Sequence, residues 1–156
     1  WRDFRLKWDP KKFDDVSVAR IFHYYVWIPD LEILQAFETT RNGVRVVLYS
    51  TGELLHIPPI KVKLRCYRQD DGDYNCPFSV ASWVWDGSYV DLDYFEGKRE
   101  IDLTDFIELP GTTVVGTTAE KKTMYYPCCP EPYPSMQFNI TLRENWDQSL
   151  NEISPA

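Results

Sequence analysis

The sequence has no run of about 20 apolar residues, the length that a membrane-spanning helix needs. It also has no N-terminal leader, and Trp1 already falls inside an alternating pattern, so we expect a domain whose beginning is missing. Basic residues are in deficit: 17 Lys and Arg stand against 24 Asp and Glu, for a net charge of −7. Proteins that bind nucleic acid usually present an excess of basic residues, which is the opposite of this balance. Nucleic acid is therefore not an expected partner.

Motifs for catalysis and metal binding are lacking as well. The chain contains no nucleophile elbow, phosphate-binding loop or paired-carboxylate motif, so we do not expect an enzyme or a cofactor. The two histidines, His23 and His56, do not stand at metal-binding spacing with the cysteines, so no metal site is predicted.

Aromatic residues and period-two alternation are abundant instead. Six Trp, ten Tyr and eight Phe suit pleated sheets and binding surfaces. Apolar and polar residues alternate over residues 4–8, 60–66 and 136–142, as in strands with one buried face. Asp71-Gly72 and Asp86-Gly87 mark turns, and one helical turn is expected near residues 10–14 with Asp9 as its N-cap. The 156 residues therefore predict one all-β domain, residues 1–156, folded as an antiparallel sandwich.

The same alternation places Trp1 on a polar strand face. It shares parity with Asp3, Arg5 and Lys7, opposite the expected core set of Phe4, Leu6 and Trp8. A large aromatic there is either a frayed terminal residue or an interface residue.

Four cysteines, Cys66, Cys76, Cys128 and Cys129, indicate disulfides and a secreted or extracellular protein, and four cysteines allow three pairings. The triplet that begins at Asn139 permits glycosylation. The adjacent Cys128 and Cys129 lie in a proline-rich hairpin tip flanked by tyrosines. They bond either to each other, which makes a stiff apolar tip, or separately to Cys66 and Cys76.

The segment Tyr126-x-Cys128-Cys129-x-x-x-Tyr133 resembles loop C of the Cys-loop receptor family, in nicotinic acetylcholine receptor α-type subunits and soluble acetylcholine-binding proteins. Other landmarks of that family follow in its order. Residues 27–30 (WIPD) resemble the segment leading into loop A, 82–87 (SWVWDG) resemble loop B, 1–8 resemble loop D, and 55–59 (LHIPP) match the end of loop E. The resemblance covers essentially the whole chain, without the family's N-terminal helix and first strand.

The resemblance implies an immunoglobulin-like β-sandwich that binds acetylcholine or nicotine-like amines in an aromatic cage between subunits. Trp83 takes the place of the cage tryptophan, with Tyr126, Tyr133 and the Cys128–Cys129 ring from loop C. Trp1 provides the wall contributed by the neighbouring subunit, and Val47, Leu55 and Ile57 form its apolar floor. Such sites require a homo-oligomeric ring, a pentamer in this family. We further expect the disulfides Cys66–Cys76 and Cys128–Cys129, because one pair spans a loop and the other is adjacent.

Two departures from the family matter. Leu34 stands where the family usually has a cage tyrosine. The segment between Cys66 and Cys76 is short and polar and lacks the family's aromatic tip, which in channels touches the pore domain. This favours a soluble binding protein. The alternatives are the outer domain of a ligand-gated channel subunit, which meets a membrane only if a channel domain follows, or an extracellular sandwich that binds carbohydrate or protein.

Overall fold

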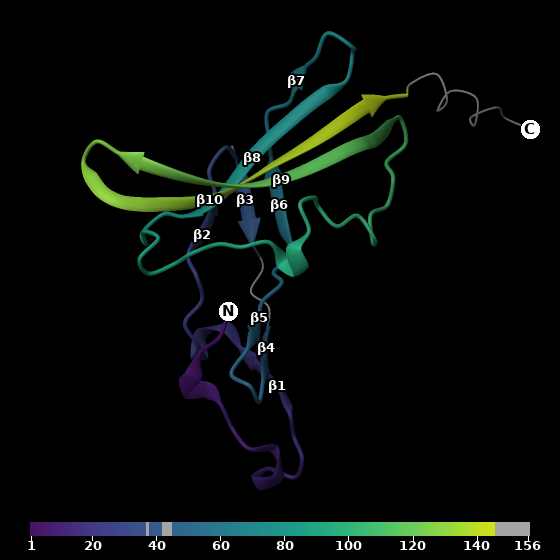
Figure 1. The fold of residues 1–156 in the computed structure, drawn as a ribbon. Coiled ribbons are helices and arrows are strands. Elements are labelled where there is room, and N and C mark those ends of the chain that lie inside the picture. Colours follow the sequence, from purple (N-terminus) through teal and green to yellow (C-terminus); the bar gives the residue numbers. More distant parts are fainter. Residues whose placement is uncertain (37, 42–44, 146–156) are drawn as a thin grey trace, which may run out of the picture. The chain divides into compact units, whose positions relative to one another are not determined.

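The structure is a computed structural model that describes residues 1–36, 38–41 and 45–145. Strands dominate it, and the helical elements of the described residues are four 3₁₀ turns: η1 (Phe4–Leu6), η2 (Pro10–Lys12), η3 (His23–Tyr25) and η4 (Phe95–Gly97) (Figure 1). No helix in this described part has the length and apolar character to cross a membrane. Contacts divide the chain into two compact units. Unit 1 comprises Trp1–Ile28 and Thr39–Lys61, and unit 2 comprises Pro29–Glu38 and Val62–Ala156.

Unit 1 is built on a small antiparallel sheet in the order β1 (Val18–Phe22), β4 (Arg45–Tyr49), β5 (Leu54–Leu55). Its core is the cluster of Val46, Leu48 and Leu54, in which Val46 is fully buried. Partly buried side chains pack around this cluster: Trp1, Leu6, Trp8, Ile21, Val26 and Ile28.

The strand expected over residues 4–8 is wrong, because Phe4–Leu6 forms the 3₁₀ turn η1. Asp3 closes this turn: its carboxylate accepts from the Arg5 backbone N–H at 3.0 Å and from the Arg5 guanidinium at 2.9 and 2.7 Å. Strand parity therefore does not apply here. Phe4 is exposed, whereas Trp1 packs against the cluster and meets the Trp27 ring edge-on at 6.5 Å. The turn expected near residues 10–14 does form, as η2, with Asp9 accepting from the Lys11 N–H.

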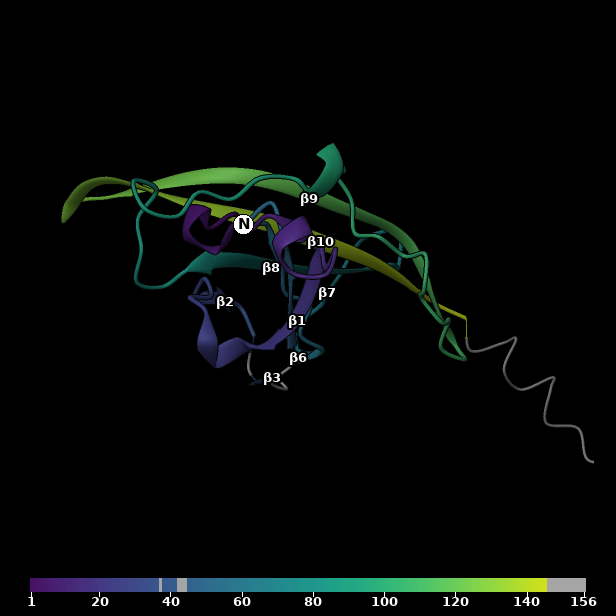
Figure 2. The same cartoon turned by 90° about the horizontal axis from the view of Figure 1, so that it is seen from below.

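Unit 2 carries the larger sheet, in the order β2 (Leu31–Ile33), β8 (Tyr74–Ser82), β10 (Cys129–Glu144), β9 (Thr112–Tyr126). The short strand β7 (Tyr67–Arg68) also pairs with β8, and these pairings are all antiparallel. In Figures 1 and 2 the long hairpin of β9 and β10 curves along its length. A separate two-stranded sheet pairs β3 (Glu38–Arg41) with β6 (Ile60–Lys63).

The two faces of the larger sheet differ in character. On one face Phe138 stacks on Phe78 at 5.2 Å and, with Met136, lines a hollow shared with Tyr94 and Ile101. A hydrogen bond holds the segment before β9 against this face: the Arg99 carbonyl accepts from the Ala119 N–H at 2.8 Å. The alternation of β10 turns Tyr133, Ser135, Gln137 and Asn139 toward the other face. That face carries the candidate site.

Candidate functional site

The loop after β8 displays Trp83 because a single carboxylate bonds the residues on both sides of it, one through its hydroxyl and the other through its backbone. Asp30 accepts from the Ser82 hydroxyl at 2.6 Å and from the Val84 N–H at 3.0 Å. The Ser82 hydroxyl in turn accepts from the Trp85 N–H at 2.8 Å. Trp83 itself is left 76% exposed. These bonds position the indole without covering it.

Asp30 is ionised in this network. Burial opposes its charge, but hydrogen bonds from Ser82 and Val84 outweigh that effect and lower the pKa of Asp30 below its ordinary value. A carboxylate accepting several hydrogen bonds makes stronger bonds than a neutral acceptor would.

The same loop is joined to the hairpin strand. The Gly87 N–H donates to the Pro132 carbonyl at 2.7 Å. A Cβ at position 87 would come within 3.1 Å of that oxygen and 3.2 Å of the rings of Pro132 and Pro134. Glycine therefore allows the two segments to approach closely.

The hairpin tip lies between Tyr126, the last residue of β9, and Cys129, the first of β10. Cys128 and Cys129 are disulfide-bonded to each other. The rings of Tyr126 and Tyr133 meet edge-to-face with centroids 5.3 Å apart. This geometry is favourable for aromatic pairs and leaves ring faces free for other contacts.

A hollow of about 520 Å³ brings these segments together. Four of the residues predicted for the cage line it: Leu34, Trp83, Tyr126 and Tyr133. Cys128 and Cys129 are at the tip and are not among the lining residues. Its other lining residues, which the sequence analysis did not identify, are Gln35, Ser79, Ala81, Ser82, Met124, Ser135 and Gln137.

Two of these unpredicted lining residues, Ser135 and Gln137, could have been found from strand alternation. Tyr133, Ser135 and Gln137 lie at alternate positions of one strand, so a cage residue at Tyr133 places the next two on the same face. Ser79 could not be found this way, because it joins them through the pairing of β8 with β10, in which it lies opposite Gln137.

Among the residues that the structure describes, no charged side chain lines this hollow. Aromatic faces, two amides and several hydroxyls can therefore bind a cation without a formal counter-charge, or a neutral polar group. Within the described residues no group of three His, Cys, Asp or Glu could hold a metal ion.

The residues predicted for the half of the site that a neighbouring subunit contributes all lie in unit 1. Val47 and Leu55 are direct cross-strand partners of β4 and β5, and Ile57 just beyond β5 is exposed. The backbone of Trp1 lies beside these residues, because its carbonyl accepts a hydrogen bond from the Leu54 N–H at 2.8 Å. Its side chain packs on the buried cluster of unit 1.

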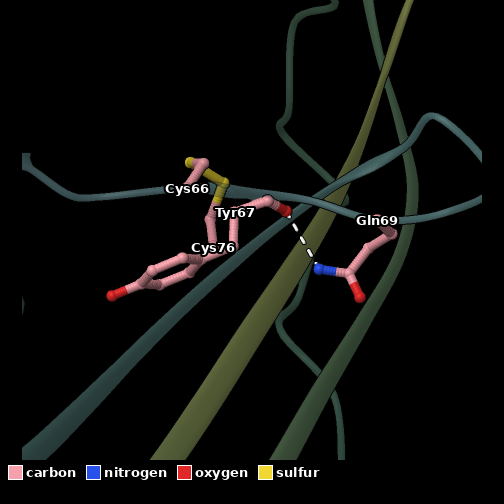
Figure 3. The surroundings of a disulfide bond; sticks show 4 residues. All are labelled: Cys66, Tyr67, Gln69 and Cys76. Atoms are coloured by element: carbon pink, nitrogen blue, oxygen red, sulfur yellow. Dashed lines mark hydrogen bonds between the residues drawn. A yellow bond between two sulfur atoms is a disulfide. The ribbon is translucent and has the colours of Figure 1, made fainter.

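The second expected disulfide, Cys66–Cys76, also forms and closes a short polar loop (Figure 3). Within the loop the Gln69 side chain donates to the Tyr67 carbonyl at 3.0 Å. Asp73, only 5% exposed, receives two hydrogen bonds from Arg143 near the end of β10, at 2.8 and 2.7 Å. These bonds lower the pKa of Asp73, and the pair ties the loop to β10.

Asn139, the predicted glycosylation site, lies in β10 between β8 and β9. It is half-buried, and its side-chain oxygen is buried without a hydrogen-bond partner among the described residues.

Known proteins share this architecture. A family model described as the neurotransmitter-gated ion-channel ligand binding domain matches residues 1–145. Acetylcholine receptor subunit alpha-like 2 of Drosophila melanogaster is 30% identical over 160 residues, covering 92% of this chain and 27% of that protein. Acetylcholine receptor subunit alpha-L1 of Schistocerca gregaria is also 30% identical, with 92% of this chain and 28% of the relative covered. The chain thus spans little more than a quarter of the length of these relatives.

A solved structure, the AChBP of Capitella teleta in complex with lobeline, matches with a TM-score of 0.83 at 30% identity. The match covers 93% of this chain and 68% of that one. It confirms the expected antiparallel β-sandwich class. With the family match over residues 1–145, it establishes that this chain belongs to the neurotransmitter-gated ion-channel ligand-binding domain family.

Proposed function

We propose that the hollow binds acetylcholine or a related cationic nicotinic amine in an aromatic cage. The observation that supports this most is the convergence of Trp83, Tyr126 and Tyr133 in one hollow, which none of the described charged side chains lines. A quaternary or protonated amine is attracted to the negative faces of such rings, by about 0.5 to 2 kcal/mol per contact according to how fully water is excluded. Indole offers the best face, so Trp83 is the main cation–π partner.

Loop C completes the principal half of the site. Tyr126 and Tyr133 close the cage, and the Cys128–Cys129 disulfide acts as a polarisable cover at the hairpin tip. Leu34 provides an apolar wall where an aromatic residue would hold the cation more strongly. The affinity for acetylcholine is therefore lower than a fully aromatic cage would give.

A second copy of the chain supplies the complementary half through Trp1, Val47, Leu55 and Ile57. All the principal-half residues belong to unit 2 and all the complementary ones to unit 1. Each copy therefore offers both halves, and head-to-tail contacts that close into a ring use every site. We propose a homo-pentamer in which units 1 and 2 together form one ligand-binding domain.

The protein acts outside the cell, as a soluble binding protein. The two disulfides support an oxidising compartment. The exposed, polar loop between Cys66 and Cys76 supports a soluble protein, because Arg68, Gln69 and Asp70 suit contact with water. The alternative, the outer domain of a channel subunit, is supported by the receptor subunits among its relatives. Sequencing the complete transcript beyond Ala156 distinguishes the two.

The neighbouring tyrosines of β9 provide a matched test of the cage. Tyr126 lines the hollow, whereas Tyr125 is 67% exposed and points to the opposite face of the strand. Titration calorimetry with acetylcholine and nicotine should show weaker binding by Tyr126→Ala and unchanged binding by Tyr125→Ala. Equal losses in both variants, or binding of sugars in place of amines, would refute the proposal.

A further inference from the structure

A second hollow, of about 440 Å³, adjoins the hollow of the candidate site on the larger sheet. The two hollows share the lining residues Gln35, Ser79 and Gln137. Away from this shared wall, the second hollow is lined in part by polar side chains of three neighbouring strands: Asn75 of β8, Asn139 of β10, and Thr118 and Glu120 of β9. The proposed cage makes no use of this polar hollow.

Asn139 begins an acceptor triplet for N-linked glycans, and its side chain is oriented for that modification. Asn139-Ile140-Thr141 is the one Asn-x-Ser/Thr triplet in the 156 residues. Among the described residues, the buried polar atoms without a partner include Oδ1 of Asn139 but not its Nδ2, and no described residue bonds Nδ2. The nitrogen, which is the atom that a glycan modifies, is therefore accessible in a hollow that Asn139 lines.

The side chains around Asn139 have hydrogen-bonding groups that the protein leaves unused. Thr118 lies directly opposite Asn139 in the pairing of β9 with β10, and Gln137 lies two residues earlier on the same face. Neither side chain forms a hydrogen bond with a described residue. On the other side, Asn139 is paired with Pro77 of β8, which lines the hollow with an apolar ring. Hydroxyl and amide groups beside an apolar surface suit a sugar, whose ring has hydroxyls at its edge and C–H groups on its faces.

We propose that Asn139 carries an N-linked glycan whose first sugar, an N-acetylglucosamine, lies in the second hollow against Thr118 and Gln137. This rests on the proposed extracellular location, because the donor, an oligosaccharide linked to a polyprenyl pyrophosphate, and its transferase belong to the secretory pathway. In the transfer a bond forms between Nδ2 and C1 of the sugar, and Nδ2 loses one proton. The bond from C1 to the pyrophosphate oxygen breaks, and its electron pair leaves with the polyprenyl pyrophosphate. Because C1 is bonded directly to Nδ2, the first sugar begins inside the hollow.

Intact mass spectrometry of the full-length protein secreted by eukaryotic cells tests the attachment. The wild type and Thr141→Ser, which keeps the acceptor triplet, should each carry one glycan that peptide N-glycosidase removes. Thr141→Ala, which leaves Asn139 in place but destroys the triplet, should carry none. A secreted, disulfide-bonded wild type without a glycan would overturn the proposal and leave the extracellular location and the cage standing. A wild type retained in the cytosol with reduced cysteines would refute the extracellular location and this proposal with it.

Melting temperatures test where the first sugar lies. Protein from cells that retain high-mannose glycans is trimmed to the first sugar with endoglycosidase H and compared with glycan-free protein of the same sequence from the bacterial periplasm. The sugar should raise the melting temperature by about 2 to 4 °C, the shift that one net hydrogen bond gives in a domain of this size. Thr118→Val should remove this gain, whereas Thr123→Val, at an exposed threonine on the other face of β9, should keep it. No gain in the wild type, or a gain that Thr118→Val leaves unchanged, would place the sugar outside the hollow and overturn the proposal.

Discussion

Removing the indole of Trp83 should abolish most of the affinity for cationic amines while leaving the fold intact. In the described chain this side chain is 76% exposed, so it contributes little buried surface to folding. Its loop is held by the Asp30 bonds to Ser82 and Val84, which a substitution at position 83 does not remove. Trp83→Ala should therefore change the melting temperature by only a few degrees.

The expected loss of binding is much larger. The indole is the strongest cation–π face of the proposed cage, and a bound ligand together with the neighbouring copy would cover it from water, so truncation should cost about 2 kcal/mol. That corresponds to roughly a 30-fold higher Kd for acetylcholine. Calorimetry with acetylcholine measures the change, and Val84→Ala is the matched control. Val84 lies in the same loop, is exposed, and bonds Asp30 only through its backbone.

Two results would refute this reasoning. An unchanged Kd in a folded Trp83→Ala protein would make Trp83 a bystander. A loss of affinity accompanied by a large fall in melting temperature would make it a structural residue.

Three further predictions follow from other parts of unit 2. Leu34→Tyr should tighten acetylcholine binding several-fold by restoring an aromatic wall, and calorimetry that finds no change would place Leu34 outside contact with the head. Glu120→Gln leaves the Lys122 ammonium without its ion-pair partner, opposite Ser135 of the hollow, so it should weaken the binding of cationic ligands at low salt and much less at high salt. Lys122→Gln should strengthen their binding at low salt, and titrations at two salt concentrations check both predictions. Arg143 lowers the pKa of Asp73, so the stability contributed by that pair is complete above the ordinary carboxyl pKa of about 4 and is lost as the pH falls through the lowered value. Melting curves should therefore show Arg143→Gln less stable than the wild type at neutral pH, with the difference vanishing in acid.

The features predictable from the sequence are those set by neighbouring residues. The alternation around Phe138 identified β10, because period two is a local property of a strand with one buried face. Asp9 before Pro10 identified the short turn η2 in the same way. The tyrosines flanking Cys128 and Cys129 indicated the hairpin tip, and two of them, Tyr126 and Tyr133, line the hollow.

The strand expected over residues 4–8 failed because a local polar interaction competes with alternation. Asp3 bonds both the backbone and the side chain of Arg5, and this closes a 3₁₀ turn that an apolar pattern does not reveal. Trp1 was consequently assigned to a polar face, although it packs on the core of unit 1.

The supporting residues of the site were missed for a different reason. Asp30 meets Ser82 across a separation of 52 residues, and Ser79 joins Gln137 only through strand pairing. No periodicity within a short window relates such positions. Recognising them requires knowledge of which strands are neighbours.

The prolines of the hairpin tip also bear on the entropy of ligand capture. The ladder between β9 and β10 is interrupted between Cys129 and Tyr133, so the segment that contains Pro130 and Pro132 is not fixed by regular pairing. Ordering a flexible loop over a ligand would cost about 1 to 2 kcal/mol per residue. Two proline rings and the disulfide at Cys129 already restrict this backbone in the unliganded protein. The tip therefore has little conformational freedom left to lose when a ligand binds beside it.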